Sequence, residues 1–197
     1  MRLILASSSS SRKRMLHAAG APCEAIPARI DEHAIKEAML AEEAPPRDIA
    51  DKLAELKAER IARKFPDALV VGADQVLIQG QRLYDKPNSM AEAADHLRAL
   101  SGKSHELLSA AVLYEEGKPV WRHIGRAQLI MRPLSKIFIE QYLAEEGSDI
   151  LECVGAYRLE GRGAQLFTRV QGDYFTVLGL PLLDLLGPLR QRNVLPT

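Results

Sequence analysis

The order of apolar and polar segments at the N-terminus restricts the fold most strongly. Four apolar residues at 3–6 are followed by five serines at 7–11 and then by a helical pattern over 12–19. Gly20 and Pro22 come directly after this pattern, and both residue types commonly end helices. Strand, polar loop and helix in this order are typical of α/β folds, whose helix N-termini point free N–H groups at the loop. The serine run is therefore either a loop that holds an anion or an ordinary flexible linker.

Helix and strand patterns continue along the whole chain. Helical spacing and capping residues predict helices over 48–65, 89–102, 135–147 and from Pro181 onward. Apolar, β-branched and aromatic runs predict strands over 69–73, 76–78, 82–84, 107–114, 120–131, 165–170 and 174–179. Strand–helix units at the front and hairpins in the middle indicate an α/β fold with a mixed β-sheet. No clean domain boundary is visible, so residues 1–197 are expected to form a single domain.

Charge and cysteine content exclude several protein classes. The 26 basic and 26 acidic residues balance, so the chain has no general surface for nucleic acid. Cys23 and Cys153 are far apart and show no metal or redox spacing, which predicts a reduced, cytoplasmic compartment. The first apolar run is too short for a signal peptide, and the apolar segment 175–189 is broken by two prolines and an aspartate. We therefore expect a cytoplasmic protein without a membrane partner.

Several segments match known catalytic or nucleotide-binding motifs only in part. The segment 101–104 resembles the end of a phosphate-binding P-loop, but Leu97 stands where that motif requires glycine. Gly161 and Gly163 lack the third glycine of a dinucleotide-binding loop. The five histidines have no metal-ligand spacing, and the sequence has no Gly-x-Ser-x-Gly elbow. Neither a zinc hydrolase nor a serine hydrolase is supported.

Charged residues at the ends of predicted elements remain as candidates. Asp74 directly follows an apolar strand, where a carboxylate is costly unless it is paired or serves a cleft. Lys86 lies in a turn before Pro87, and Lys57 lies in a charged helix. Each has an ordinary structural interpretation too: Asp74 could cap a turn, and both lysines could be solvated surface residues.

The order of these segments along the chain resembles the Maf family. The matching segments are the Ala-Ser-Ser-Ser loop with Arg12, and residues 53–58, 72–74, 85–87, 100–102, 155–157, 160–161 and 179–182. The resemblance implies a nucleoside triphosphate pyrophosphatase, which cuts between the α and β phosphates and releases a nucleoside monophosphate and pyrophosphate. It also implies an elongated mixed β-sheet flanked by helices, with two lobes and a central cleft, similar to inosine triphosphate pyrophosphatases. Family members are often dimeric, which makes a homodimer one expected form.

The resemblance also assigns roles to individual residues. It implies that Asp74 is the catalytic proton acceptor, and that Asp74 and Glu32 bind a divalent metal cation, Mg²⁺ or Mn²⁺. The residues that it implies in phosphate binding are Ser7, Ser8, Arg12, Lys57 and Lys86. Cations and loop N–H groups suit a triphosphate, which brings about four negative charges. On this interpretation the serine loop is a phosphate cradle, although Ser10 stands where the family usually has proline.

The resemblance implies that Ser11, Gln75 and Glu160 determine which nucleotide base is preferred. The Asp-Gln pair and Glu160 resemble the branch of the family that acts on 7-methyl-GTP, whose cationic base could pair with a carboxylate. Ala156 and Tyr157 resemble the dTTP and UTP branch instead, and Ser11 matches neither. A dTTP/UTP pyrophosphatase and a non-catalytic nucleotide-binding regulator of septum formation therefore stay as alternatives.

Overall fold

A seven-stranded mixed β-sheet forms the centre of the α/β fold in this computed structural model, which describes residues 1–196. The strand order is β2-β1-β3-β5-β6-β7, and β4 pairs with β3. β1 runs parallel to β2 and β3, whereas β3–β4 and β6–β7 are antiparallel. The strands are β1 Leu3–Leu5, β2 Glu24–Ala25, β3 Leu69–Gln79, β4 Arg82–Tyr84, β5 Ser104–Glu115, β6 Lys118–Met131 and β7 Phe167–Gln171. The mixed sheet predicted from the sequence is confirmed.

Seven α-helices and three short 3-10 helices complete the described part of the chain. The α-helices are α1 Ser10–Ala18, α2 Glu32–Ala41, α3 Pro46–Ala62, α4 Met90–Leu100, α5 Lys136–Glu146, α6 Tyr174–Val177 and α7 Leu182–Gln191. The 3-10 helices span Gly147–Glu152, Val154–Ala156 and Arg162–Leu166. Within these residues, no helix has the length and apolar character needed to cross a membrane.

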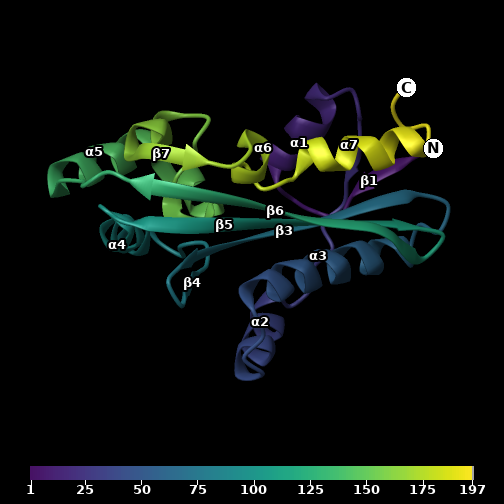
Figure 1. Cartoon of the computed structure of the whole chain (residues 1–197), viewed down its shortest axis with the longest axis horizontal. Helices are drawn as coiled ribbons and strands as arrows, with labels where there is room; N and C mark the ends of the chain where they lie inside the picture. Colours follow the sequence, from purple (N-terminus) through teal and green to yellow (C-terminus); the bar gives the residue numbers. More distant parts are fainter. Residues whose placement is uncertain (197) are drawn as a thin grey trace. The chain divides into compact units, whose positions relative to one another are not determined.

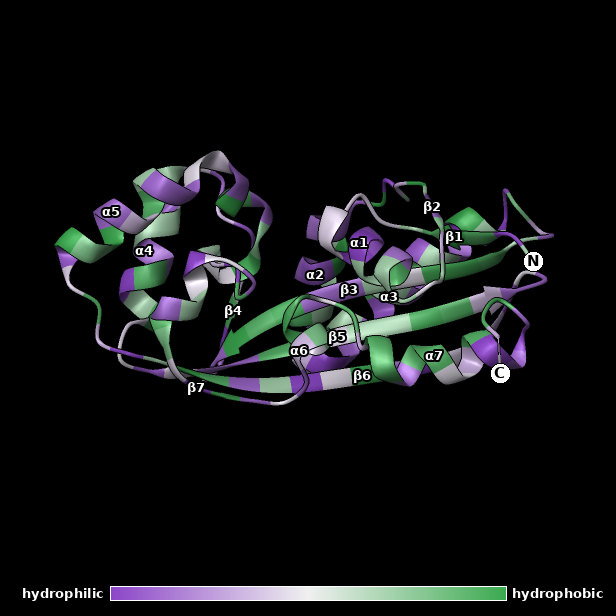
Figure 2. Cartoon of the chain, turned by 90° about the horizontal axis from the view of Figure 1, so that it is seen from above, coloured by the Kyte–Doolittle hydropathy of each residue, from purple (hydrophilic) through white to green (hydrophobic). Residues whose placement is uncertain are grey.

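The chain divides into two compact units, and each unit is assembled from separate segments. Unit 1 contains Met1–Gln75, Leu108–Gly125 and the segment from Asp173 onward. Unit 2 contains Val76–Leu107 and Arg126–Gly172. The long strands β3, β5 and β6 contribute residues to both units, and hydrophobic residues run along them (Figure 2).

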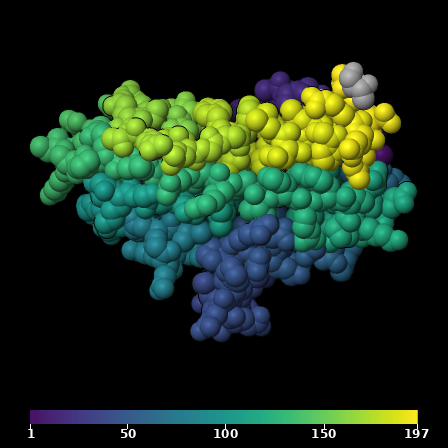
Figure 3. All heavy atoms as spheres, in the orientation of Figure 1, coloured from purple at the N-terminus to yellow at the C-terminus, as the bar shows by residue number. Residues whose placement is uncertain are grey.

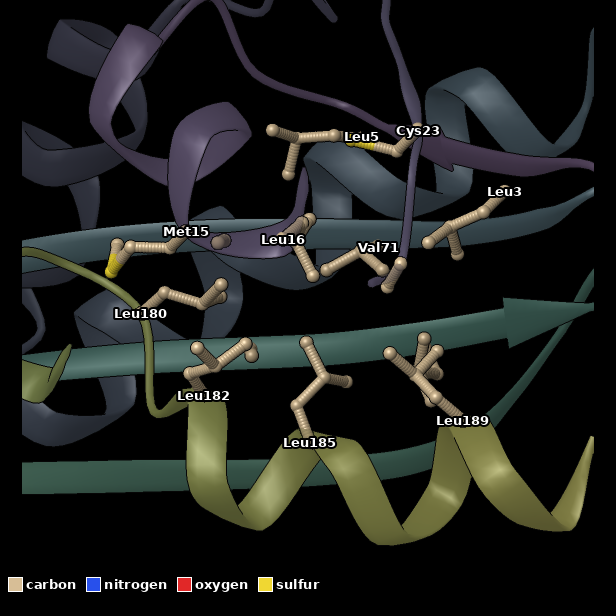
Figure 4. Close-up of a cluster of buried hydrophobic side chains, with 14 of the residues drawn as sticks. Leu3, Leu5, Met15, Leu16, Cys23, Val71, Leu180, Leu182, Leu185 and Leu189 are labelled. Atoms are coloured by element: carbon tan, nitrogen blue, oxygen red, sulfur yellow. The ribbon is translucent and has the colours of Figure 1, made fainter. Parts of the chain in front are cut away.

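Unit 1 has helices on both faces of its strands: α1 and α7 lie on one face and α3 on the other (Figure 1). Leu182, Leu185 and Leu189 lie on one side of α7, with the spacing of an amphipathic helix. They pack in one buried cluster with Leu16 of α1 and Val71 of β3 (Figure 4). Leu183, on the opposite side of α7, is 58% exposed, so the helix buries a single stripe.

Capping residues predicted from the sequence begin two helices of unit 2. Ser89 caps α4 by accepting a hydrogen bond from the Glu92 N–H, and Ser135 caps α5 by accepting one from the Phe138 N–H. Gly147 ends α5 with φ +67°, a conformation that glycine adopts at little cost. Both helices therefore begin and end within one or two residues of their predicted bounds.

The segment 174–179 was predicted to be a strand, and this is wrong. Residues Tyr174–Val177 form the short helix α6. The Asp173 carboxylate caps it by accepting hydrogen bonds from the N–H groups of Phe175 and Thr176. The aromatic and β-branched composition of this segment favours a strand, but side-chain capping and tertiary hydrogen bonds to its carbonyl groups outweigh that preference.

Candidate active site

Lys57 joins two carboxylates in unit 1. Its Nζ lies 2.6 Å from Asp74 Oδ1 and 2.9 Å from Glu32 Oε1. The Lys57 and Asp74 side chains are only 9% and 7% exposed, whereas the Glu32 side chain is 46% exposed. The structure thus brings three predicted site residues together from α3, β3 and the start of α2. The interpretation of Lys57 as a solvated surface residue is wrong.

The close packing of α3 on β3 explains how Lys57 reaches Asp74. Successive side chains of a strand point to opposite faces, so Gly72 and Asp74 face the same side. A Cβ at Gly72 would overlap the backbone oxygen of Ala54 and lie 2.7 Å from Ala58 Cβ, both of which belong to α3. Glycine on the strand and alanines on the helix therefore let the two backbones approach closely. Lys57 then reaches Asp74, the next residue of β3 that faces α3.

Asp74 lies inside β3 rather than at its end. The alternative interpretation from the sequence, in which Asp74 caps a turn, is therefore wrong. Its Oδ2 is buried and, among residues 1–196, has no hydrogen-bond partner. A buried carboxylate oxygen without a donor is costly, so it indicates a role other than stability. Because Lys57 holds Oδ1, the lone pairs of Oδ2 stay available for a proton or a cation.

The serine run forms the N-terminus of α1, as expected for an anion-binding loop. Ser9 is the N-cap of α1, and its Oγ accepts a hydrogen bond from the Arg12 N–H. Ser7 is buried and accepts from the Ser9 N–H at 3.2 Å, whereas Ser8 is exposed. Ser11 accepts a hydrogen bond from Arg14 Nη2. The interpretation of this run as a flexible linker is wrong, since these hydrogen bonds order it.

Arg12 is partly buried and binds protein oxygens with two of its three nitrogens. Nε donates to Gly179 O at 2.7 Å, and Nη1 donates to Ser7 Oγ at 3.3 Å and Ala73 O at 3.2 Å. Burial lowers the pKa of Arg12 from its ordinary value, and the carboxylates of Asp74 and Glu32 partly offset this. Arg12 thus fixes the serine loop, the strand next to Asp74 and the loop after α6.

Gln75 lies on the other face of the strand from Asp74. Its Nε2 donates to Ser109 Oγ at 2.9 Å and to the carbonyl oxygens of Thr176 and Val177, each at 3.1 Å. Ser109, which is fully buried on β5, donates to the same Thr176 oxygen at 2.7 Å. Sequence reasoning did not find Ser109. A serine inside an apolar strand pattern was the only signal for it.

Lys86 and Glu160 belong to unit 2. Lys86 Nζ forms an exposed ion pair with Glu152 Oε2 at 3.0 Å. Glu160 is exposed, and its carboxylate helps to raise the pKa of the Cys153 thiol to about 11, although burial is the larger cause. The Cys153 thiol therefore stays protonated at neutral pH and is a poor nucleophile.

The backbone between Cys153 and Glu160 is unusual. Gly155 and Ala156 both have positive φ, +76° and +57°. A left-handed alanine costs free energy, and such strain is concentrated at functional sites. A Cβ at Gly155 would lie 2.5 Å from Leu77 Cδ1 and 2.8 Å from the Tyr157 ring, so glycine is required there.

The donor set around Asp74 fits a magnesium ion better than a metal with an all-protein cage. No group of three or more His, Cys, Asp and Glu side chains among the described residues is arranged to hold a metal. Mg²⁺ usually binds one or two carboxylates and completes its shell with water and substrate phosphate. Glu32 and Asp74 supply such a pair of carboxylates.

Comparisons with known proteins find relatives that match nearly the whole chain. The chain is 52% identical over 193 residues to a nucleoside triphosphate pyrophosphatase from Hyphomonas neptunium, covering 98% of this chain and 97% of the relative. It is 52% identical over 189 residues to a 7-methyl-GTP pyrophosphatase from Rhizobium meliloti, covering 96% and 95%. It is 53% identical over 194 residues to a nucleoside triphosphate pyrophosphatase from Roseobacter denitrificans, covering 98% of each chain. The family model described as Maf-like protein matches residues 2–192, and the chain belongs to the Maf family.

Proposed function

We propose that this protein is a nucleoside triphosphate pyrophosphatase that hydrolyses the α–β phosphoanhydride bond. The observation that carries the proposal is the buried contact between Lys57 and Asp74, in which Oδ2 of Asp74 has no donor among the described residues. Burying this pair costs several kcal/mol of desolvation per ion, which a purely structural site would avoid. A non-catalytic nucleotide-binding protein would need the cations but not the carboxylate.

The residues of unit 1 divide the work of hydrolysis among them. Asp74 Oδ2 accepts a proton from water while the water oxygen attacks the α-phosphorus. A bond forms between that oxygen and phosphorus, the bond from phosphorus to the bridging oxygen breaks, and pyrophosphate leaves with the bonding electrons. Lys57 holds the Asp74 carboxylate in place during this step.

Phosphate binding falls to the serine loop and to the cations. The N–H groups at the start of α1 and the remaining Nη2 of Arg12 are the donors that we assign to the triphosphate in unit 1. Lys86 is the donor that we assign in unit 2. Glu32 and Asp74 would hold Mg²⁺ or Mn²⁺, which, when bound, neutralises the negative charge that develops on pyrophosphate.

We assign 7-methyl-GTP as the preferred substrate. Gln75 and Glu160 match the 7-methyl-GTP branch of the family, and a relative of that name is 52% identical. A carboxylate at Glu160 suits a base that carries positive charge. A dTTP or UTP pyrophosphatase is the second candidate, because Ala156 and Tyr157 match that branch.

The proposal is tested by following pyrophosphate release from a panel of nucleotides with Mg²⁺ or Mn²⁺. Asp74→Asn is expected to lower turnover by about 10²–10⁴-fold, the usual contribution of a general base, while nucleotide binding measured without divalent metal changes little. Asp67→Asn, at an exposed aspartate of unit 1, is the matched control and should keep its turnover. Near wild-type turnover of Asp74→Asn, or direct release of inorganic phosphate, contradicts the proposal.

A further inference from the structure

A hollow of about 490 Å³ opens between α2 and α3, on the side of unit 1 where α2 stands out from the rest of the unit (blue in Figure 3). Its apolar lining comes from Ile30, Ile35 and Leu56, which are all half-buried. This volume is typical of pockets for small organic ligands. None of the residues of α2 is buried, so this helix leaves the apolar lining uncovered.

Two cations without an ion pair line this hollow. Arg60, in the last turn of α3, and Lys64, just beyond its C-cap Arg63, line it and are exposed, and neither side chain has an ion pair within residues 1–196. Because both side chains line the same hollow, their like charges repel each other. Basic residues at the end of α3 also interact favourably with the helix dipole. The dipole does not explain the apolar hollow beside them. An anionic group between Arg60 and Lys64 would relieve their repulsion.

The acidic residues of the hollow fix the direction in which a ligand would lie. Glu59 is paired with Arg63, so its charge is neutralised. Asp31 caps α2 by accepting a hydrogen bond from the Ala34 N–H at 3.0 Å, and it lies next to Ile30. A ligand anion is therefore repelled from the Asp31 end and attracted to Arg60 and Lys64.

We propose that this hollow binds a small amphipathic monoanion. Its apolar body lies among Ile30, Ile35 and Leu56, and its acidic group lies between Arg60 and Lys64. The residues on its two walls directly precede Glu32 and Lys57, whose side chains are in contact. A bound ligand therefore sets how α2 presents Glu32 to Lys57. This coupling to the candidate active site rests on the proposed function, whereas the binding does not.

Binding is tested with 8-anilinonaphthalene-1-sulfonate, an aromatic sulfonate that fluoresces in apolar surroundings. We expect one saturable site per chain, which pyrophosphate at saturating concentration does not displace. Replacing Arg60 and Lys64 together by glutamate should weaken binding by about tenfold or more, since charge-assisted contacts are lost. Ile35→Ser, at a half-buried position on α2, should weaken it by removing apolar contact.

The control reverses two other exposed cations, Lys118→Glu with Arg169→Glu, and gives the same change in net charge. This variant should bind the probe as the wild-type protein does. Equal affinities of the Arg60/Lys64 variant and the control, or full displacement of the probe by pyrophosphate, overturn the binding site. Asp74→Asn should bind the probe normally, so loss of the proposed activity leaves this result intact. Turnover that does not change at saturating probe overturns the coupling to Glu32.

Discussion

Asp74 and Gln75 are neighbours on β3, but their side chains contact opposite faces of the strand. Asp74 meets Lys57 of α3, and Gln75 meets the carbonyl oxygens of Thr176 and Val177 on α6. This follows from the two-residue period of a strand. The Asp-Gln pair therefore combines the residue that we propose as the general base with a residue that holds α6 on the other face of the strand.

Gln75→Thr should destabilise the protein, because threonine cannot reach both carbonyl groups of α6. Thr176 O keeps its hydrogen bond from Ser109, but Val177 O loses its donor. An unsatisfied buried acceptor costs about 1–3 kcal/mol, which denaturant unfolding would measure. Amide hydrogen exchange should become faster at 174–178. Gln128→Thr on β6 is the control, since the Gln128 side chain forms no hydrogen bond within residues 1–196. Equal exchange rates in both variants would mean that Gln75 does not hold α6.

Gly72→Ala should destabilise unit 1 by forcing α3 away from β3. The added methyl group would overlap the Ala54 carbonyl oxygen, which is backbone and cannot rotate away. Overpacking of this kind costs about 1–3 kcal/mol or more. Gly187→Ala in α7 is the control, because nothing lies within 4 Å of its added Cβ. The control should be neutral or more stable, since alanine favours helices over glycine.

The elements of this fold were predictable where local pattern and tertiary packing agree. Helices α4 and α5 carry serine caps and glycine stops, so their bounds followed from the sequence. Helix α6 was missed because its conformation depends on Gln75 and Ser109, which are distant in sequence. Helix α2 was also missed, since it buries no residue and so has a weak hydrophobic pattern.

The residues of the candidate site were also predictable only where a local sequence pattern marks them. A carboxylate after an apolar strand marked Asp74 as unusual. The pattern of α3 did not mark Lys57, because it lies among charged residues and its burial depends on Gly72. The roles of Arg12 toward Gly179 and Ala73 needed the structure, since hydrogen bonds between segments more than 60 residues apart leave no local signal.

Stability should fall on acidification because of His105. It is 2% exposed, its Nε2 lies 2.8 Å from the Tyr157 hydroxyl, and burial lowers its pKa from 6.5 to about 4. Between these values the unfolded chain binds the proton and the folded chain does not, so stability rises with pH and is lost below pH 6.5. The full effect is about 3 kcal/mol.

Unfolding curves of wild-type protein and His105→Gln from pH 4 to pH 7 would measure this contribution. The variant loses the titrating group and should show a flatter dependence of the unfolding free energy on pH. His33→Gln is the control, because His33 is exposed on α2. Parallel curves for His105→Gln and wild type would contradict the assignment to His105.

Glu160→Gln should change which nucleotides the enzyme uses. The substitution keeps the size of the side chain, removes its charge and adds an N–H donor. Loss of a charge-assisted contact should lower the kcat/KM for 7-methyl-GTP by about 10- to 100-fold, equivalent to about 1.5–3 kcal/mol. The values for dTTP and UTP should hold or rise, because an amide can meet both a donor and an acceptor on those neutral bases.

The ratio of kcat/KM for the two substrate classes decides between the branches, because discrimination is a ratio of these values. Glu152→Gln is the matched control: it also removes a carboxylate in unit 2, but one that pairs with Lys86. It should change the use of all triphosphates alike and leave the ratio constant. A constant ratio in Glu160→Gln as well would show that Glu160 does not contact the base. A wild-type enzyme that prefers dTTP or UTP would place the chain in the other branch, while the role of Asp74 would stand unchanged.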